Sequence, residues 1–216
     1  MDYNRVFGKH AVTGLFLYEQ SEGNTAYLYG FRNKMLSTSI EQLFIDAAAE
    51  NKDATGSETE TGRLGYVGRF TYGYDNRYLL EANFRYDASL KFAPEGRWGF
   101  FPSVAVGWVL SEESFVKDRW SFVDNLKLRI SHGLLGNDGG DNVAEYGYIN
   151  RYSITPGAVF GGATAGIMPG ALPNYDITWE KTRITNAGVD FSFLKVDLVV
   201  PWNIFKNTRM ISLANG

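Results

Sequence analysis

The chain has 216 residues, enough for one large domain or two small ones. Aromatic residues make up 15% of it, which excludes a disordered chain, and the net charge is −3 with no basic block, which argues against nucleic acid as a partner. There is no cysteine, and the two histidines, His10 and His132, lie far apart in sequence. We therefore expect neither a metal site nor a cofactor.

The sequence contains no segment that resembles a membrane helix, because no run of 18 apolar residues occurs. The first ten residues also lack the basic and apolar regions of a signal peptide. Neither observation excludes a membrane β-barrel, whose strands are individually weak hydropathy signals.

Six stretches are predicted to be β-strands, because apolar and polar residues alternate along them. Most have about the nine to eleven residues that a tilted strand needs to cross a bilayer. In chain order they are 10–20, 63–74, 77–87, 100–110, 125–135 and 185–194.

The alternation gives each strand two chemically different faces. The polar face carries Arg77, Glu81, Asn83, Arg85, Lys127 and Arg129. The apolar face carries Tyr78, Leu80, Phe84, Tyr86, Val104, Val106, Trp108, Leu126, Leu128 and Ile130. In a soluble protein the apolar face would pack against a second sheet, whereas in a membrane barrel it would face lipid and the polar face a wet lumen.

The connections between the strands favour the membrane barrel. Asp75 and Asn76 form a tight hairpin signal, whereas long polar segments separate the strands at 21–62 and 136–184. Short and long connections on alternate sides are typical of such barrels. Aromatic residues also gather at strand ends, as in an interfacial girdle: Tyr72, Tyr74, Tyr78, Tyr86, Trp98, Phe100 and Phe101. A short amphipathic helix is predicted near 39–50.

Four stretches of this sequence resemble the SusC/RagA-type TonB-dependent outer-membrane transporters of Bacteroidota. They are 4–22, 63–112, 125–138 and 177–194. The resemblance implies an all-β fold: an antiparallel transmembrane β-barrel of about 22 strands whose lumen is plugged by a separate domain. It also implies import of oligosaccharides or peptides across the outer membrane, with a SusD-like surface lipoprotein and the TonB complex as partners.

Only part of that family pattern is present. Residues 1–195 match a partial barrel domain, and we see no plug domain and no TonB box. We therefore expect an internal piece of a barrel wall that is inactive alone. Residues 196–216 lose the alternation around Pro201, which suggests either a shifted reading frame or an ordinary divergent strand.

No catalytic set is recognisable, so we do not expect an enzyme. Glu112 and Glu113 lie at a predicted turn, where we expect them to be solvated. Asp138 and Asp141 lie in a Gly-rich stretch but lack the spacing of a calcium loop, which favours a polar turn.

Ligand contacts are expected in the outer loops, where aromatic rings could stack on sugars. The candidates are Tyr146, Tyr148, Tyr152, Phe160 and Tyr175, and ordinary loop packing explains each of them equally well. The competing interpretation from another class is a soluble β-rich carbohydrate-binding module.

Overall fold

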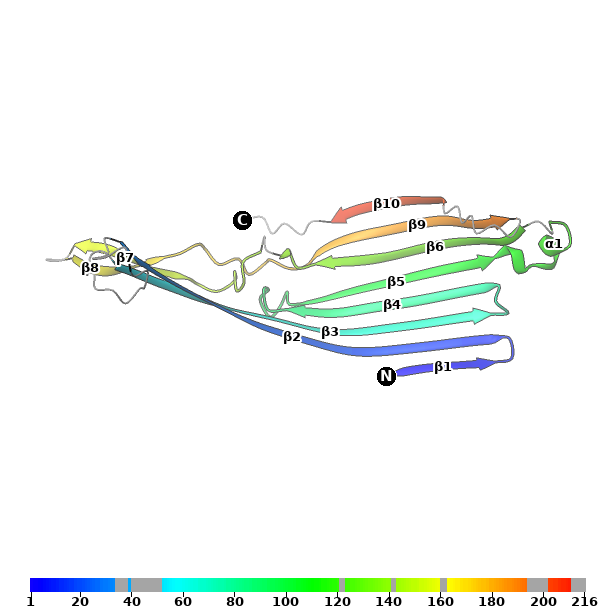
Figure 1. Cartoon of the computed structure of the whole chain (residues 1–216), viewed down its shortest axis with the longest axis horizontal. Coiled ribbons are helices and arrows are strands. Elements are labelled where there is room, and N and C mark those ends of the chain that lie inside the picture. The colour runs from blue at the N-terminus through cyan, green and yellow to red at the C-terminus, as the bar shows by residue number, and fades with distance from the viewer. Residues whose placement is uncertain are drawn as a thin grey trace. The chain divides into compact units, whose positions relative to one another are not determined.

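A computed structural model shows a chain built almost wholly of β-strands (Figure 1). It describes residues 1–33, 39, 52–120, 123–140, 143–159, 163–193 and 202–210. Eight strands form one meandering sheet in the order β1-β2-β3-β4-β5-β6-β9-β10. Their bounds are β1 Asp2–Phe7, β2 His10–Arg32, β3 Lys52–Tyr74, β4 Tyr78–Ser89, β5 Trp98–Val109, β6 Val123–Asn137, β9 Glu180–Phe193 and β10 Trp202–Met210.

All six predicted strands are confirmed, and the structure adds to them. β2 runs on to Arg32 and β3 begins at Lys52, so much of the polar segment predicted to be a loop is strand. β1 and β10 were missed, and so was a separate hairpin of β7 Tyr152–Val159 and β8 Ala163–Pro169. The helix predicted near 39–50 lies outside the described residues, apart from Ser39.

The tightest links lie at one end of the strands and the longest at the other, as the sequence predicts, but the lengths overlap, because 110–122 is longer than 90–97. At one end of the strands, which we call the turn end, the links are 8–9, 75–77, and 110–122 with η2 Leu110–Glu112 and α1 Ser114–Lys117. Asp75 and Asn76 have φ of 51° and 56°, the conformation of the tight hairpin turn that favours Asn and Asp. At the other end, the loop end, the links are 33–51, 90–97 and 138–179.

The pairing register keeps polar and apolar residues on separate faces, because directly opposed residues in an antiparallel pair share a face. One row across the sheet is apolar, ending with an aromatic ring: Ile204, Ala187, Ile130, Val106, Leu80 and Tyr72. The next row is mostly polar, with Phe205 and Ala105 as exceptions: Phe205, Asn186, Ser131, Ala105, Glu81 and Thr71. Pro102 is tolerated in β5 because pairing with β6 begins only at Ser103.

The described residues form no thick hydrophobic core. The buried apolar cluster consists of Phe92, Phe101 and Trp179, at the loop end of the sheet. Contacts divide the chain into two units, one of Met1–Ser21 with Arg63–Gly216 and the other of Glu22–Gly62, the outer part of the β2–β3 hairpin. Among the described residues, no helix is both long and apolar enough to cross a bilayer.

Candidate functional site: two faces of one sheet

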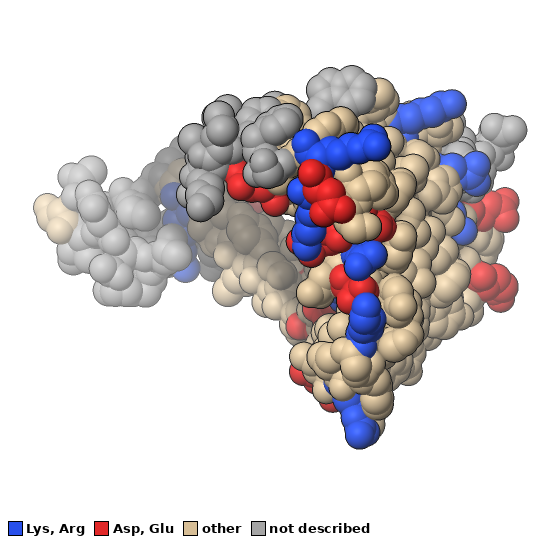
Figure 2. All heavy atoms as spheres, turned by 90° about the vertical axis from the view of Figure 1, so that its right-hand side faces the viewer, with Lys and Arg blue, Asp and Glu red and all other residues tan. Residues whose placement is uncertain are grey.

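The polar face of the sheet is lined by ion pairs within and between strands. Arg69 Nη2 lies 3.0 Å from Glu81 Oε2, and Arg129 Nε lies 3.1 Å from Asp190 Oδ2. Arg85 pairs with Asp87 at 3.0 Å and reaches Glu19 on β2 at 3.4 Å. Seen from the turn end, basic and acidic side chains alternate in a band beside a broad uncharged surface (Figure 2). Four of the predicted polar-face residues therefore take part in these contacts: Glu81, Arg85 and Arg129 directly, and Asn83 through its hydrogen bond to Glu81 at 2.9 Å.

Described residues of this polar face line two hollows. The first has a volume of about 460 Å³ and lies toward the loop end, where its lining includes Glu19, Arg63, Arg85, Asp87, Asp138 and Trp179. The second, of about 370 Å³, lies toward the turn end between Thr13, Glu81, Lys127 and Arg129. Glycine keeps both hollows open, because a Cβ at Gly65 would lie 2.4 Å from Asp87 and one at Gly107 would lie 3.2 Å from Lys127. Hollows that are lined by paired charges suit a hydrated, polar ligand.

The opposite face is apolar and uncovered by any second layer within the described ranges. Val104, Val106 and Ile130 in the middle of the sheet keep 44%, 48% and 56% of their surface exposed. The other predicted apolar-face residues are half-buried or exposed in the same way: Tyr78, Leu80, Phe84, Tyr86, Trp108, Leu126 and Leu128. A contiguous apolar surface of this kind marks an interaction with lipid or another apolar partner.

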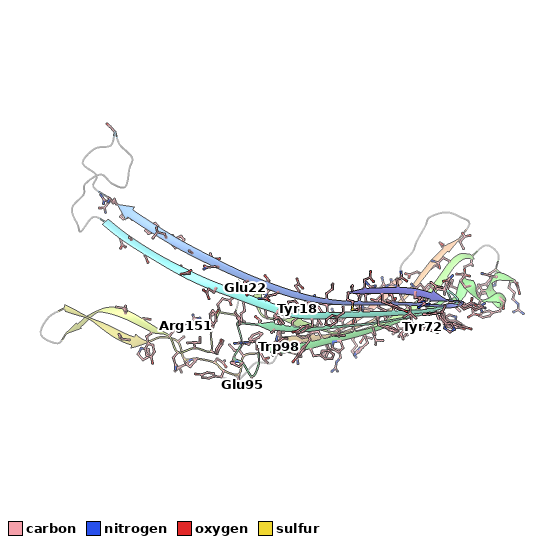
Figure 3. All side chains as sticks on the ribbon, turned by 90° about the horizontal axis from the view of Figure 1, so that it is seen from below. Tyr18, Glu22, Tyr72, Glu95, Trp98 and Arg151 are labelled. Atoms are coloured by element: carbon pink, nitrogen blue, oxygen red, sulfur yellow. The ribbon has the colours of Figure 1, made fainter. Side chains whose placement is uncertain are left out.

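Aromatic rings form two bands on the apolar face, one at each end of the strands. At the turn end Tyr74, Tyr78 and Trp108 stack in line, with successive ring centroids 6.4 Å apart. At the loop end Tyr66 and Tyr86 stack on Trp98 with centroids 6.2 Å and 4.6 Å away. Figure 3 shows Tyr72 near the turn end of the strands, and Trp98 and Tyr18 at a distance from it, where β5 begins and β2 runs on. Two aromatic bands on the apolar face are the arrangement of the interfacial girdles of a membrane barrel.

Phe101 was wrongly predicted to belong to a girdle. It points to the polar side, where it is 7% exposed and meets Trp179 edge to face with ring centroids 5.2 Å apart. Trp179 Nε1 donates to the carbonyl oxygen of Arg97 at 2.9 Å, which ties the 90–97 loop to the start of β9. Asp138, considered as a calcium ligand, instead binds Arg63 at 2.7 Å. This cluster holds together three loop-end segments that are remote in sequence.

Glu113 was wrongly predicted to be solvated, because it is only 8% exposed. Its Oε1 accepts hydrogen bonds from the Tyr78 hydroxyl at 2.8 Å and from Trp108 Nε1 at 3.1 Å. Its Oε2 accepts one from Arg77 at 3.2 Å. These donors, the Tyr78 hydroxyl first, hold the pKa of Glu113 below its usual range. At the adjacent turn the ammonium of Lys9, 3.0 Å away, likewise lowers the pKa of Asp75.

The candidate ligand-binding aromatics are only partly brought together. Tyr146 and Tyr148 have ring centroids 6.3 Å apart, and the Tyr148 hydroxyl accepts a hydrogen bond from Arg97 at 3.3 Å. Asn174 donates its backbone N–H to the carbonyl oxygen of Gly147 at 3.2 Å, so Tyr175 lies on the segment next to this pair. Tyr152 is exposed on β7. Phe160 and Asp141 fall outside the described residues.

The described residues bring together no catalytic or metal-binding group. Ser131 Oγ accepts from Asn186, whereas His132 Nδ1 contacts the Thr185 hydroxyl at 2.8 Å, so the adjacent serine and histidine have separate partners on opposite faces. No three of their His, Asp and Glu side chains form a group that could hold a metal ion.

Comparison with known proteins identifies relatives along most of the chain. It is 34% identical over 203 residues, 90% of its length, to the TonB-dependent receptor P39 of Formosa agariphila. It is 37% identical over 150 residues, 68% of its length, to the TonB-dependent receptor SusC of Bacteroides thetaiotaomicron. The chain spans only 18% and 15% of the length of these two relatives. No family model matches the sequence.

Solved structures share its fold. The RagAB peptide transporter superposes with a TM-score of 0.82 at 19% identity, over 96% of this chain and 22% of the other. The RagAB peptide importer in its closed-closed state superposes with a TM-score of 0.81, also at 19% identity and with the same coverage of both chains. The sequence relatives and the shared sheet agree, and the chain belongs to the SusC/RagA-type TonB-dependent receptors.

Proposed function

We propose that this chain forms part of the wall of an outer-membrane β-barrel that imports oligosaccharides or peptides with energy from TonB. In this arrangement Arg77, Glu81, Asn83, Arg85, Lys127 and Arg129 face the lumen. Tyr78, Leu80, Phe84, Tyr86, Val104, Val106, Trp108, Leu126, Leu128 and Ile130 face outer-membrane lipid.

The observation that carries the proposal is the exposed apolar face between two aromatic bands. In a soluble β-sandwich, residues such as Val106 and Ile130 would be covered by a second sheet about 10 Å away. Here they keep 48% and 56% of their surface exposed, although the sheet around them is fully paired. Lipid is the partner that fits an apolar band bounded by Tyr and Trp rings.

The ligand and the partner proteins are proposed at the level of class. Hollows with paired charges on the polar face, and the Tyr146–Tyr148 pair among the loops, suit a hydrated substrate such as an oligosaccharide or a peptide. Family membership supports a SusD-like surface lipoprotein and the TonB complex as partners of the whole receptor. Eight strands cannot close a barrel of about 22, so we propose that this chain alone does not transport.

Membrane fractionation tests the proposal against a soluble carbohydrate-binding module. We expect the chain in the outer-membrane fraction, released only by detergent. Recovery as a stable soluble monomer would contradict the barrel assignment. Ligand uptake by vesicles that contain only this chain would contradict its inactivity alone.

A further inference from the structure

The outer part of the β2–β3 hairpin has one face of aromatic rings and hydroxyl groups, and we propose that this face binds a neutral oligosaccharide. The outer hairpin is the unit Glu22–Gly62, and Glu22, labelled in Figure 3, marks where it begins on β2. The aromatic–hydroxyl face consists of Tyr27, Tyr29 and Phe31 on β2 and Thr55, Ser57, Thr59 and Thr61 on β3. As a step of import the inference rests on the proposed function, whereas binding itself is measurable without it.

Contacts between β2 and β3 fix which residues share a face. A Cβ at Gly23 would lie 2.7 Å from Thr61 Oγ1, so these two residues point to the same side of the hairpin. On the other side, a Cβ at Gly56 would lie 3.7 Å from Leu28 Cδ1. Both pairs fit one antiparallel register. Because successive residues of a strand alternate between faces, the odd-numbered residues of both strands lie together on the side of Gly23 and Thr61.

The three rings are open to solvent and form a regular row. Tyr27, Tyr29 and Phe31 keep 58%, 42% and 44% of their surface exposed. They are two residues apart along β2, so the row advances about 7 Å from one ring to the next and spans about 14 Å. In the register above, Ser57 is opposite Tyr27 and Thr55 is opposite Tyr29. An extended ligand can therefore touch several rings and several hydroxyl groups at once.

Charged side chains are absent from this face but present on the other one. The odd-numbered positions of 23–31 and 55–61 include no Asp, Glu, Lys, Arg or His. The even-numbered positions of β3 between them carry Glu58 and Glu60, and Asn24 on β2 donates to Glu58 Oε1 at 2.8 Å. A charged ligand would find no opposite charge on the aromatic–hydroxyl face. Its chemistry therefore favours a neutral ligand.

A neutral sugar chain matches both the rings and the hydroxyl groups. One side of a pyranose ring presents C–H groups that pack on an aromatic ring, and its rim presents hydroxyls that bond to Ser and Thr. An oligosaccharide repeats this pattern along its length, as the face does. A neutral peptide binds a sheet through backbone groups, which lie at strand edges and not on a face. A lipid chain would leave the hydroxyl groups unmatched.

Titration of the full chain with defined oligomers tests this inference. The chain is refolded in a detergent without sugar headgroups and titrated by calorimetry. Maltohexaose, cellohexaose and xylohexaose are the neutral sugar probes, hexagalacturonate is the acidic one, and a library of uncharged hexapeptides represents peptides. We expect at least one neutral hexasaccharide to bind, and neither hexagalacturonate nor the peptides to bind.

Substitutions then locate the binding. Tyr27→Ala, Tyr29→Ala and Phe31→Ala should each weaken the binding of that sugar about fivefold, whereas Tyr27→Phe keeps the ring and most of the affinity. Ser57→Ala removes a hydroxyl group and should weaken binding by about the same factor. Leu28→Ala is the matched control, because Leu28 lies on the other face of the same strand and is 86% exposed. Circular dichroism checks that each variant keeps its strand content.

The outcomes separate the two proposals. Binding of none of the neutral hexasaccharides, unchanged binding in the three alanine variants, or an equal loss in Leu28→Ala contradicts this inference and leaves the proposed function intact. Peptide binding that is lost in the same variants would assign the face to a peptide and also contradict it. Recovery of the chain as a stable soluble monomer contradicts the proposed function, and with it a role in import, while the titration still decides whether this face binds sugar.

Discussion

Glu113 accepts the hydroxyl hydrogen of Tyr78 at 2.8 Å, and this bond joins two residues 35 positions apart in the sequence. Because Trp108 donates to the same carboxylate oxygen, the bond also fixes the last ring of the turn-end aromatic band. The carboxylate thereby holds the 110–117 segment against β4 and β5. The turn-end girdle therefore depends on a residue that the sequence pattern places in an ordinary turn.

Removing the carboxylate should loosen this end of the sheet. In Glu113→Ala the donors of Arg77, Tyr78 and Trp108 lose their acceptor, whereas Glu113→Gln keeps an acceptor and loses only the charge. We expect a lower midpoint of urea unfolding for both variants and a larger loss for alanine, read from tryptophan fluorescence in detergent. Glu112→Gln is the control, because Glu112 is partly exposed and pairs with Lys117 instead of with this cluster. An equal loss in the control would contradict the account.

Acid should weaken the same contact. Since the pKa of Glu113 lies below its ordinary value of 4.5 in the folded chain, its stabilising effect is complete above pH 4.5. The effect is lost as the pH falls from 4.5 through the lowered pKa of the folded chain. In this range the unfolded chain binds more protons than the folded chain, so acid favours unfolding. Unfolding midpoints measured from pH 7 to pH 3 should fall for the wild type and fall less for Glu113→Gln. Parallel curves would exclude this group as a contributor.

A positive charge should destabilise the folded chain much more on the apolar face of β5 than on its polar face. Val106→Arg places a cation in the middle of the apolar face, which we expect to cost about 2–4 kcal/mol of folding free energy in a bilayer. Ala105→Arg, at the neighbouring residue, points to the polar face opposite Glu81 and should cost much less. Folding into vesicles measured by circular dichroism and electrophoretic mobility gives the comparison. Similar losses at both positions would contradict the assignment of the faces.

The loop-end cluster should behave as a small hydrophobic core. Phe101→Ala removes the ring between Trp179 and Gly136, and we expect a loss of about 3–5 kcal/mol in local stability. Hydrogen exchange should report this as faster exchange in 90–97 and at the start of β9. Phe100→Ala is the matched control, since the neighbouring ring lies on the apolar face and is 51% exposed. The cluster has no such role if both variants exchange alike.

The hairpin turn offers a test of backbone conformation. Asn76 has φ of 56°, so Asn76→Ala should destabilise the β3–β4 hairpin by about 1 kcal/mol, whereas Asn76→Gly should not. Thermal unfolding in detergent distinguishes the two variants. Equal midpoints for alanine and glycine would show that the turn does not limit stability.

The sequence predicts the sheet well where one face is apolar and the other polar, as in 77–87. It fails where that contrast is missing: residues 21–26 and 52–62 are mostly polar on both sides, and residues 27–31 carry aromatic or apolar side chains on both, so β2 and β3 are predicted too short. β7 carries Pro156 and Gly157, and Pro201 precedes β10, so neither shows a clean period of two. A reading-frame change near Lys195 stays a prediction for the coding DNA.

The site residues show the same limit. Alternation assigns Glu81 and Val106 to their faces because it is a local property. It cannot foresee that Glu113 is buried or that Phe101 packs on Trp179, because those contacts join segments 35 and 78 positions apart. Packing at the loop end depends on contacts between segments that are remote in sequence. The periodicity of a single strand carries no information about such contacts.

The measurement that tests the central claim most directly is the environment of successive residues along β4. The chain has no cysteine, so single cysteines from 78 to 87 can each carry a spin label without background. In membranes we expect labels at Tyr78, Leu80, Phe84 and Tyr86 to collide with dissolved oxygen, and labels at Glu81, Asn83 and Arg85 with a water-soluble nickel complex. Equal accessibility at even and odd positions, or the reverse pattern, would contradict a lipid-facing apolar face.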